Sequence, residues 1–204
     1  MVCDLAYAPR MGNRDDLLKG AKQCLYEKGY ARTTARDIAA VSRVSMASIG
    51  YHFGSMEALL NTALLQATEE WGEEFSQAMA ESDDASAAPL ERFEAKWKRV
   101  IESFSAHRSL LAAHFEGFAQ IDHAPEVKKA FAEGMQHSRP GMAEMFSNSD
   151  SGTPSRAAGA YYQALLTGVM AQWLVDPETA PTAADLVEAL REIVAEVSAV
   201  DSLH

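Results

Sequence analysis

The stretch GYARTTARDIAAVSRVSMASIGYHFGSMEALL, residues 29–60, decides the fold of this 204-residue chain. It holds two short runs with helical spacing of apolar residues, joined by a tight turn at Arg43. Residues Thr34–Asp37 have the form of a capping box, which predicts the start of the first helix. A second helix is expected at about Ser45–His52. Two such helices form a helix-turn-helix, whose second helix can lie in the major groove of DNA.

This motif also predicts which side chains are buried and which are presented outward. The positions expected to be buried are Ile38, Ala39, Val41, Val44, Ile49 and Phe53. Hydroxyl groups and backbone N–H groups at a helix N-terminus favour a phosphate, which makes Thr33 and Thr34 candidates. The full set of candidate DNA-binding residues is Thr33, Thr34, Arg36, Arg43, Ser45, Met46, Ala47, Ser48, Tyr51 and His52. Of these, Ser45, Met46, Ser48, Tyr51 and His52 are expected to face outward.

Helical spacing continues over nearly the whole chain, and no stretch alternates like a strand. A polar linker at Glu81–Pro89 and a polar loop at Ser147–Ser155 interrupt it, and Pro140 should break or kink a helix that starts at Pro125. We predict an all-α protein of nine or ten helices, with domains at 1–56 and 57–204. The expected helices are about 13–28, 34–42, 45–52, 55–79, 90–106, 109–120, 125–139, 156–175 and 182–200.

Charge is distributed unevenly along the sequence. The net charge is −11, but residues 1–56 hold eight Lys/Arg and five Asp/Glu (+3), and residues 57–204 hold ten and twenty-four (−14). This asymmetry, unless it is chance clustering, suggests that only the first quarter meets a polyanion. The apolar runs are too short to cross a bilayer, and the first residues do not resemble a signal peptide. Cys3 and Cys24 form no metal spacing, which fits a reduced, cytoplasmic protein.

The motif resembles the TetR/AcrR family of one-component bacterial transcription regulators. The resemblance covers the first quarter of the chain in detail and extends beyond it in length and helical character. It implies an N-terminal three-helix bundle that binds a double-stranded operator, and a larger helical body for ligand binding and dimerisation. The matching residues are Gly29-Tyr30, Thr33-Thr34, Ile38-Ala39, Val44-Ser45, Ile49, His52-Phe53, Ser55, Glu57 and Leu59-Leu60.

Three positions depart from the usual family pattern. Arg43 stands where the family mostly has Gly, Gly50 where it mostly has Tyr, and Met56 where it mostly has Lys. Arg43 could replace one lost phosphate contact, and Tyr51 offers a hydroxyl one position on. Gly50 inside a helix costs about 1 kcal/mol relative to Ala, so the recognition helix is either loose or making room for a bulky neighbour.

The acidic body is rich in Phe, Trp and Met, most of which must form its core. The family typically encloses an apolar cavity among its middle helices, and Met adapts to varied ligands. The residues that we expect to line a small-molecule site are Trp97, Phe104, His114, Phe115, Phe118 and Met135. A metal site from His107, His114, Asp122 and His123 is the less favoured alternative, so we predict no metal and no cofactor.

The last two helices carry small residues and an apolar stripe. Two such helices from each of two subunits would form the four-helix dimer interface usual in the family, although packing within one chain would also use them. The expected interface residues are Ala160, Ala164, Gly168, Leu186, Leu190, Ile193 and Val197. The leading hypothesis is a ligand-responsive repressor. The alternatives are an adaptor with the same DNA-binding head but no small-molecule response, and a helical enzyme, for which we find no catalytic pairing.

Overall fold

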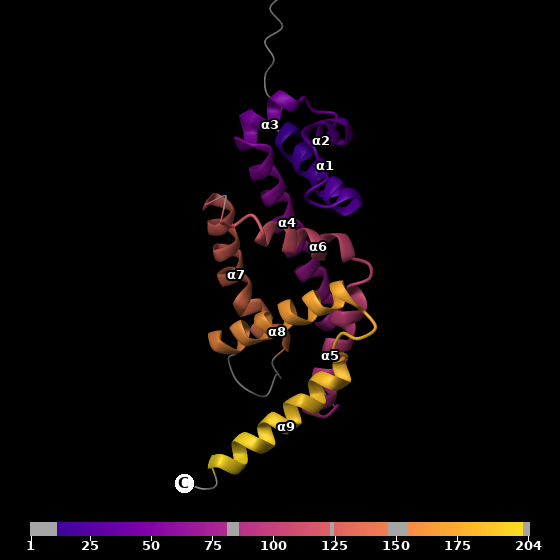
Figure 1. The fold of residues 1–204 in the computed structure, drawn as a ribbon, viewed down its shortest axis with the longest axis vertical. Helices are drawn as coiled ribbons and strands as arrows, with labels where there is room; N and C mark the ends of the chain where they lie inside the picture. The colour runs from indigo at the N-terminus through magenta and orange to yellow at the C-terminus, as the bar shows by residue number, and fades with distance from the viewer. Residues whose placement is uncertain (1–11, 81–85, 123–124, 147–154, 202–204) are drawn as a thin grey trace, which may run out of the picture. The chain divides into compact units, whose positions relative to one another are not determined.

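The computed structural model describes residues 12–80, 86–122, 125–146 and 155–201. All regular secondary structure within these ranges is helical, as the sequence predicts. The helices are α1 (Gly12–Lys28), α2 (Ala35–Ser42), α3 (Met46–Phe53), α4 (Met56–Ala80), α5 (Pro89–Ser103), α6 (Arg108–Phe118), α7 (Pro125–Phe146), α8 (Arg156–Val175) and α9 (Ala183–Asp201) (Figure 1). In the part of the chain so described, no helix is both long and apolar enough to span a membrane.

Local sequence signals explain most helix ends. Gly29 ends α1 at a φ of 80°, in the left-handed region that glycine adopts without strain, and its N–H donates to the Leu25 carbonyl. The expected capping box at Thr34 is present at the start of α2. The Ser55 hydroxyl accepts a hydrogen bond from the Ala58 N–H at 3.0 Å, so it caps α4 as predicted. Most of the predicted linker and loop, residues 81–85 and 147–154, lies outside the described residues.

The predicted end of a helix near Arg139 is wrong, because α7 continues through Pro140 to Phe146. A proline inside a helix costs about 3 kcal/mol, so other contacts must stabilise this turn. Helix α8 crosses α7 closely at this turn, since a Cβ atom at Gly159 would lie 2.1 Å from the Arg139 carbonyl oxygen. The Gln163 side chain of α8 adds a hydrogen bond to the Met135 carbonyl at 3.1 Å. The sequence near Pro140 does not record these contacts between α7 and α8.

The chain packs as two compact units, Met1–Glu69 with Ala112–Phe131 and Glu70–Leu111 with Ala132–His204. The first unit contains α1, α2, α3, the first part of α4, most of α6 and the start of α7. The second contains the rest of α4 and α7 with α5, α8 and α9. These are units of packing, and the boundary after Met56 stays a prediction about function.

In the first unit, α1 and α2 approach each other closely at a glycine. A Cβ atom at Gly20 would lie 2.9 Å from the Ser42 Cβ and 3.3 Å from the Ile38 carbonyl oxygen. Ile38 and Ser42, one turn apart, therefore form the side of α2 that meets α1. This contact turns Val41 outward, and the prediction that Val41 is buried is wrong. Ile38, Val44 and Ile49 are buried as predicted.

A buried polar contact attaches the end of α1 to α4. The Tyr30 hydroxyl donates a hydrogen bond to Asn61 Oδ1 at 2.8 Å, and both residues are buried. Burial raises the pKa of Tyr30. Leu59, Leu60 and Leu64 of α4 are buried as well. The helix-turn-helix is therefore packed on the first half of α4 rather than hanging from its end.

The second unit is built around stacked aromatic rings. Trp97 of α5 is fully buried and stacks on Phe146 of α7 with ring centroids 4.8 Å apart, and Phe146 stacks in turn on Tyr162 of α8. Helix α9 packs against α5 and then runs on past it (Figure 1).

Candidate nucleic-acid interface

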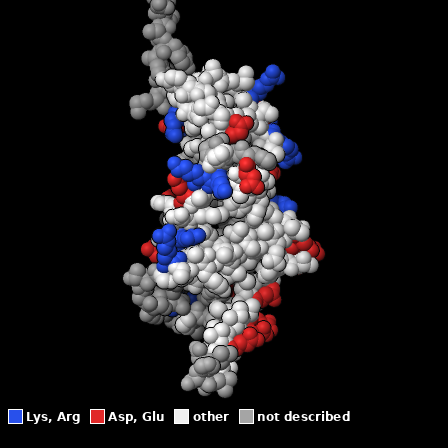
Figure 2. All heavy atoms as spheres, turned by 60° about the vertical axis from the view of Figure 1, so that its left-hand side comes forward, with Lys and Arg blue, Asp and Glu red and all other residues white. Residues whose placement is uncertain are grey.

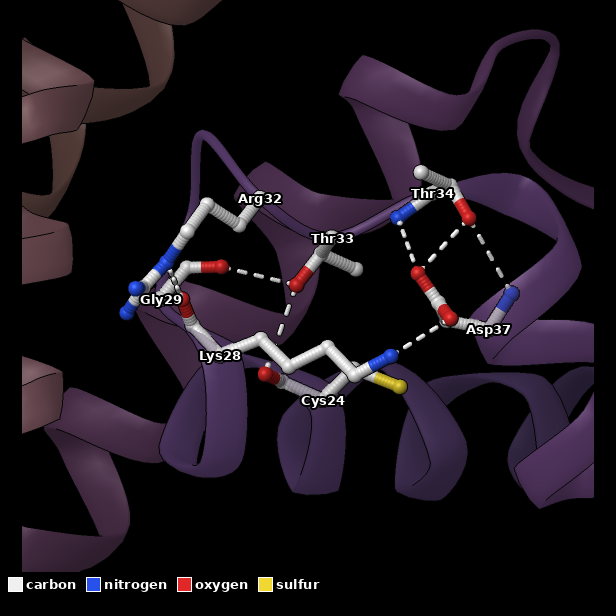
Figure 3. A network of polar contacts seen from close by, with 7 residues as sticks. All are labelled: Cys24, Lys28, Gly29, Arg32, Thr33, Thr34 and Asp37. Atoms are coloured by element: carbon white, nitrogen blue, oxygen red, sulfur yellow. Dashed lines mark hydrogen bonds and ion pairs between the residues drawn. The ribbon is translucent and has the colours of Figure 1, made fainter.

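The junction between α1 and α2 is held by a network around Asp37, which Figure 3 shows from close by. Asp37 forms an ion pair with Lys28, with 2.5 Å between Asp37 Oδ1 and Lys28 Nζ. Its other oxygen, Oδ2, accepts from the Thr34 N–H at 3.0 Å and from the Thr34 hydroxyl at 2.7 Å. The carboxylate thus joins the last turn of α1 to the first turn of α2. The contacts with Lys28 and Thr34 lower the pKa of Asp37 to about 2, so the carboxylate is charged at neutral pH.

Thr33 has a positional role in this junction. It is buried, and its hydroxyl donates a hydrogen bond to the Gly29 carbonyl at 2.7 Å. The Cys24 carbonyl is a second acceptor of this hydroxyl, at 3.3 Å (Figure 3). The sequence predicted that this hydroxyl contacts a phosphate, but in the structure the hydroxyl is not accessible. Thr34 and Arg36 are exposed at the start of α2, where a helix leaves N–H groups without acceptors of its own.

The turn between α2 and α3 has an unusual conformation at Arg43. This residue ends α2 at φ 57° and ψ 27°, and it is the one non-glycine with a positive φ in the described ranges. In this left-handed region of φ and ψ the Cβ atom comes too close to the following carbonyl oxygen, and glycine, which has no Cβ atom, avoids this. The turn therefore has the backbone conformation that suits glycine, the residue that the family mostly carries at this position. Arg43 keeps that backbone and adds an exposed positive charge beside α3.

Helix α3 presents an exposed strip formed by Met46, Ala47, Gly50 and Tyr51. Met46 is 50% exposed and Tyr51 is 75% exposed, which is high for large hydrophobic side chains. The exposed N-cap Ser45 precedes the strip. The four helical residues follow the spacing i, i+1, i+4, i+5 of one side of a helix. The helix therefore offers an outward surface to a partner.

The prediction that Ser48 faces outward is wrong. Ser48 is 8% exposed, and its hydroxyl lies 2.9 Å from that of Ser45 in a hydrogen bond. It falls next to Ile49 on the inward side of α3, where a small hydroxyl can be satisfied locally. His52 and Phe53 are both partly buried, and the rings of Tyr51 and His52 meet edge to face at 4.8 Å.

Two basic residues of the first unit were not among the sequence-based candidates. The guanidinium group of Arg14 in α1 lies over the Phe53 ring, and its carbon is 5.0 Å from the ring centroid. Arg32 is exposed, and its Nε donates to the Lys28 carbonyl at 2.8 Å. The excess of basic residues in 1–56 was the signal that pointed to them.

The two interpretations of Gly50 can now be separated in part. A Cβ atom at Gly50 would meet nothing within 4 Å, so no bulky neighbour within the described protein needs the space, and that interpretation is wrong. The looseness of α3 stays a prediction. Met56 opens α4 with its side chain partly buried.

In the first unit, an aromatic cluster surrounds His114 of α6. Its ring centroid lies 4.7 Å from that of Phe118 and 5.3 Å from that of Phe131, with Phe115 at 6.0 Å. Burial lowers the pKa of His114 to about 4, so the imidazole is neutral at neutral pH. Phe131 was not a sequence-based candidate, and a Cβ atom at Gly117 would lie 2.8 Å from its ring. Three of the six predicted ligand-binding residues, His114, Phe115 and Phe118, therefore lie together.

The other three predicted ligand-binding residues belong to the second unit. Trp97 stacks on Phe146, and Phe104 contacts the rings of Trp71 and Trp173. Both are fully buried members of a packed core. Met135 is half-buried on α7. Across the residues that the structure describes, which exclude His123, no three His, Cys, Asp or Glu side chains converge as metal ligands would.

Helix α6 also contacts the helix-turn-helix directly. The Glu116 carboxylate accepts a hydrogen bond from the backbone N–H of Ala31 at 2.7 Å. Its other oxygen would lie 3.6 Å from a Cβ atom at Gly29. Glu116 is two residues from both His114 and Phe118. The aromatic cluster and the α1–α2 junction therefore share one short segment of α6.

The predicted dimer residues differ in exposure. Every residue of 191–199 in α9 is exposed, including Ile193, Val194 and Val197 at 53–57%. Leu186 and Leu190, which precede them in the same stripe, are half-buried. On α8, Ala164 and Gly168 are exposed and Ala160 is half-buried. Figure 2 shows acidic side chains beside uncharged surface along α9.

The fold is similar to those of several solved structures. One is SCO7518, a transcriptional regulator from Streptomyces coelicolor A3(2), with a TM-score of 0.66, 20% identity, and coverage of 89% of this chain and 97% of that one. The multidrug binding protein EbrR, solved with imidazole, has a TM-score of 0.66, 20% identity and coverage of 94% and 96%. The fatty acid degradation regulator FadR from Bacillus halodurans has a TM-score of 0.56, 16% identity and coverage of 91% and 96%.

The sequence itself matches two family descriptions. Residues 17–63 match the bacterial regulatory proteins of the tetR family, and residues 88–196 match the tetracyclin repressor-like C-terminal domain. No curated protein matched the sequence. Because the two matches cover the helix-turn-helix and more than half of the chain beyond it, this protein belongs to the TetR family of bacterial transcription regulators.

Proposed function

We propose that this protein is a homodimeric, ligand-responsive repressor that binds a pseudo-palindromic operator and is released by a small apolar or aromatic effector. The observation that carries the proposal is the exposed strip of α3 (Met46, Ala47, Gly50 and Tyr51), preceded by the exposed Arg43 in a chain of this family. The proposal divides the chain into a DNA-binding part, 1–56, and a ligand-binding and dimerisation part, 57–204. It places the protein in the cytoplasm with its DNA, and gives it no catalytic role.

The proposed contacts with DNA divide into phosphate contacts and contacts with base edges. The first turn of α2, with Arg36, and the turn at Arg43 would bind phosphates on either side of the groove. Helix α3 would lie in the major groove between them, with its exposed strip toward the bases. In this arrangement Thr33 and Asp37 act as positioning residues, because they fix the α1–α2 junction from which the phosphate-binding turn projects.

The proposed dimer uses α8 and α9 from each subunit. In the single chain the second half of α9 exposes Ile193, Val194 and Val197 to solvent. Three neighbouring exposed apolar side chains on one helix favour an interface with another subunit. The small residues Ala164 and Gly168 of α8 are open and would allow a close approach of helices. A two-fold dimer would place two recognition helices on two half-sites, about one turn of DNA or roughly 34–36 Å apart.

The proposed effector site is centred on the aromatic cluster of His114, Phe115, Phe118 and Phe131. A neutral imidazole among phenyl rings favours uncharged, flat, apolar compounds. Structural neighbours of this chain include EbrR solved with imidazole and with proflavin. The effector needs to favour one head spacing over the other by about 1–3 kcal/mol to control binding.

Selection of genomic DNA fragments by the purified protein tests the central claim. We expect enriched fragments to share a two-fold symmetric sequence, with binding in gel-shift titrations that weakens steeply as salt rises. Recovery of no enriched sequence, with affinity for every duplex equal, would contradict a role as an operator-binding repressor.

Sedimentation of two α9 variants tests the dimer. Ile193→Glu places a charge in the proposed interface and should give monomers, because burying an unpaired charge costs several kcal/mol, on the order of 3–5. Ala195→Glu is the matched control, since it adds the same charge to the same exposed stretch but away from the Leu186–Val197 stripe. Monomers from both variants, or dimers from both, would place the interface elsewhere.

Imidazole is a practical first probe of effector binding, because a structural neighbour was solved with it. Binding should raise the melting temperature and change operator affinity, and operator should change imidazole affinity by the same factor. Phe118→Trp should fill the cluster and abolish the response with operator binding kept. A panel of imidazole and other uncharged aromatic compounds that leaves operator affinity unchanged would favour the adaptor alternative.

A further inference from the structure

The exposed strip of α3 is unusual in its chemistry. Its four members are a thioether, a methyl group, a bare backbone and a phenol, at Met46, Ala47, Gly50 and Tyr51. None of them carries a charge. The neighbours Ser48 and Ile49 are buried, so they do not add polar groups to this surface.

This composition limits how α3 can distinguish base pairs. Bidentate hydrogen bonds in the major groove come from Arg or Lys to guanine, Asn or Gln to adenine, and Asp or Glu to cytosine. None of these residue types occurs between Val44 and Met56. The apolar feature that the major groove offers is the C5-methyl group of thymine, and it suits contact with apolar side chains. Met46 and Ala47, adjacent and exposed, are apolar groups of this kind.

The surroundings of the strip fit a close approach to DNA. A Cβ atom at Gly50 would meet nothing within 4 Å of the described protein, so internal packing does not require the glycine. Its missing side chain leaves the α3 backbone open between Met46 and Tyr51, where a base edge can come near. The exposed Arg43, in the turn that leads into α3, supplies positive charge beside the helix, and the sequence has no acidic residue from 38 to 56.

We propose that α3 recognises thymine methyl groups, with Met46 as the principal specificity-determining residue, so that each operator half-site carries thymines under this helix. The proposal rests on the proposed function, since it assumes that α3 enters the major groove. It adds the class of base that the helix recognises and the side chain that recognises it.

Replacement of thymine by deoxyuridine tests this proposal, because it removes the C5-methyl group and leaves base pairing intact. In operator duplexes from the genomic selection, each thymine would be replaced in turn. At contacted positions we expect affinity to fall about fourfold for each methyl group, and roughly fifteenfold when both half-sites are changed. Deoxyuridine in the flanking DNA is the control and should have no effect.

The protein side of the test uses two variants at the exposed position 46. Met46→Ala should bind thymine and deoxyuridine duplexes with nearly equal affinity, because the group that contacts the methyl is gone. Met46→Leu keeps an apolar side chain of similar size and should retain most of the discrimination. Since Met46 is half exposed, neither change should disturb the fold, and circular dichroism with thermal melting checks this.

The outcomes separate this proposal from the one on which it rests. A protein that selects no DNA sequence contradicts the proposed function itself. A protein that binds its operator but does not distinguish thymine from deoxyuridine at any half-site position overturns the role of Met46. Half-sites that require guanine and tolerate any base at the thymine positions would also overturn it, and would assign recognition to an arginine outside α3.

Discussion

Replacement of Arg43 separates the backbone role of this residue from its charge. In Arg43→Gly the turn keeps its φ of 57°, but the Cβ atom that strains it is removed. The strain of a left-handed residue is about 1–2 kcal/mol, and the greater freedom of glycine in the unfolded chain offsets about 0.4–1 kcal/mol of the gain. The net expectation is a stabilisation of about 1 kcal/mol, which raises the melting temperature by roughly 2–4 °C for a chain of this size.

The same substitution should weaken binding to DNA. If Arg43 contacts one phosphate per head, its loss lowers the slope of log affinity against log salt by about 0.9 for each head. Arg43→Asn is a second uncharged variant, since Asn tolerates the left-handed region. Arg43→Lys keeps the charge and the strain. We therefore expect Gly to raise stability and both Gly and Asn to lower the slope, with Lys close to the native protein in both properties.

Thermal unfolding and salt-dependent titration of a random-sequence duplex measure these two properties without knowledge of the operator. A lower melting temperature for Arg43→Gly would refute the argument from backbone strain. A salt slope that is the same for all four proteins would show that Arg43 does not contact phosphate. Because the two results are independent, either half of the reasoning can fail alone.

Three further predictions concern the first packing unit. The pKa of Asp37 is lowered to about 2 in the folded protein, so its contribution to stability is present above its ordinary pKa of 3.8 and is lost as the pH falls through about 2. Asp37→Asn should make the free energy of unfolding depend less on pH in that window. An unchanged pH dependence would contradict the network. The pKa of His114 is lowered from 6.5 to about 4, so stability should decline as the pH falls from 6.5 to 4, by an amount of about 3 kcal/mol. His114→Phe should remove this decline, and a decline that persists would assign it to another group. Glu116→Ala should destabilise the protein by about 1–2 kcal/mol and speed hydrogen exchange at the Ala31 amide, with Glu116→Gln, which keeps an acceptor oxygen, closer to the native protein; equal protection in all three would show that the contact is not formed in solution.

Features determined within a few residues could be predicted from the sequence. The capping box at Thr34 and the end of α1 at Gly29 depend on neighbours within about one turn, and the burial of Ile38 and Ile49 follows from the helical spacing of apolar residues. The all-α fold and the strongly exposed Tyr51 follow from the same kind of pattern.

Features determined by contacts between distant segments could not be predicted in this way. Pro140 stays inside a helix that α8 approaches closely at Gly159, and nothing near Pro140 in the sequence announces that contact. Val41 is exposed because α1 meets the neighbouring side of α2 at Gly20. The aromatic cluster was found in part, since His114 and Phe118 are one turn apart, but Phe131 comes from another helix.

The bond from the Ala31 amide to Glu116 has a consequence for protein engineering. A chimera that joins the DNA-binding head of this protein to the body of another regulator has to keep such contacts. A graft that ends at residue 56 would transfer Tyr30 and Ala31 but leave behind Asn61 and Glu116, the groups that hold them. Chimeras that also carry the first half of α4 and the Ala112–Phe131 segment would move the compact unit intact. The natural cutting points of this regulator are therefore set by spatial contacts, and they fall in three places along the chain.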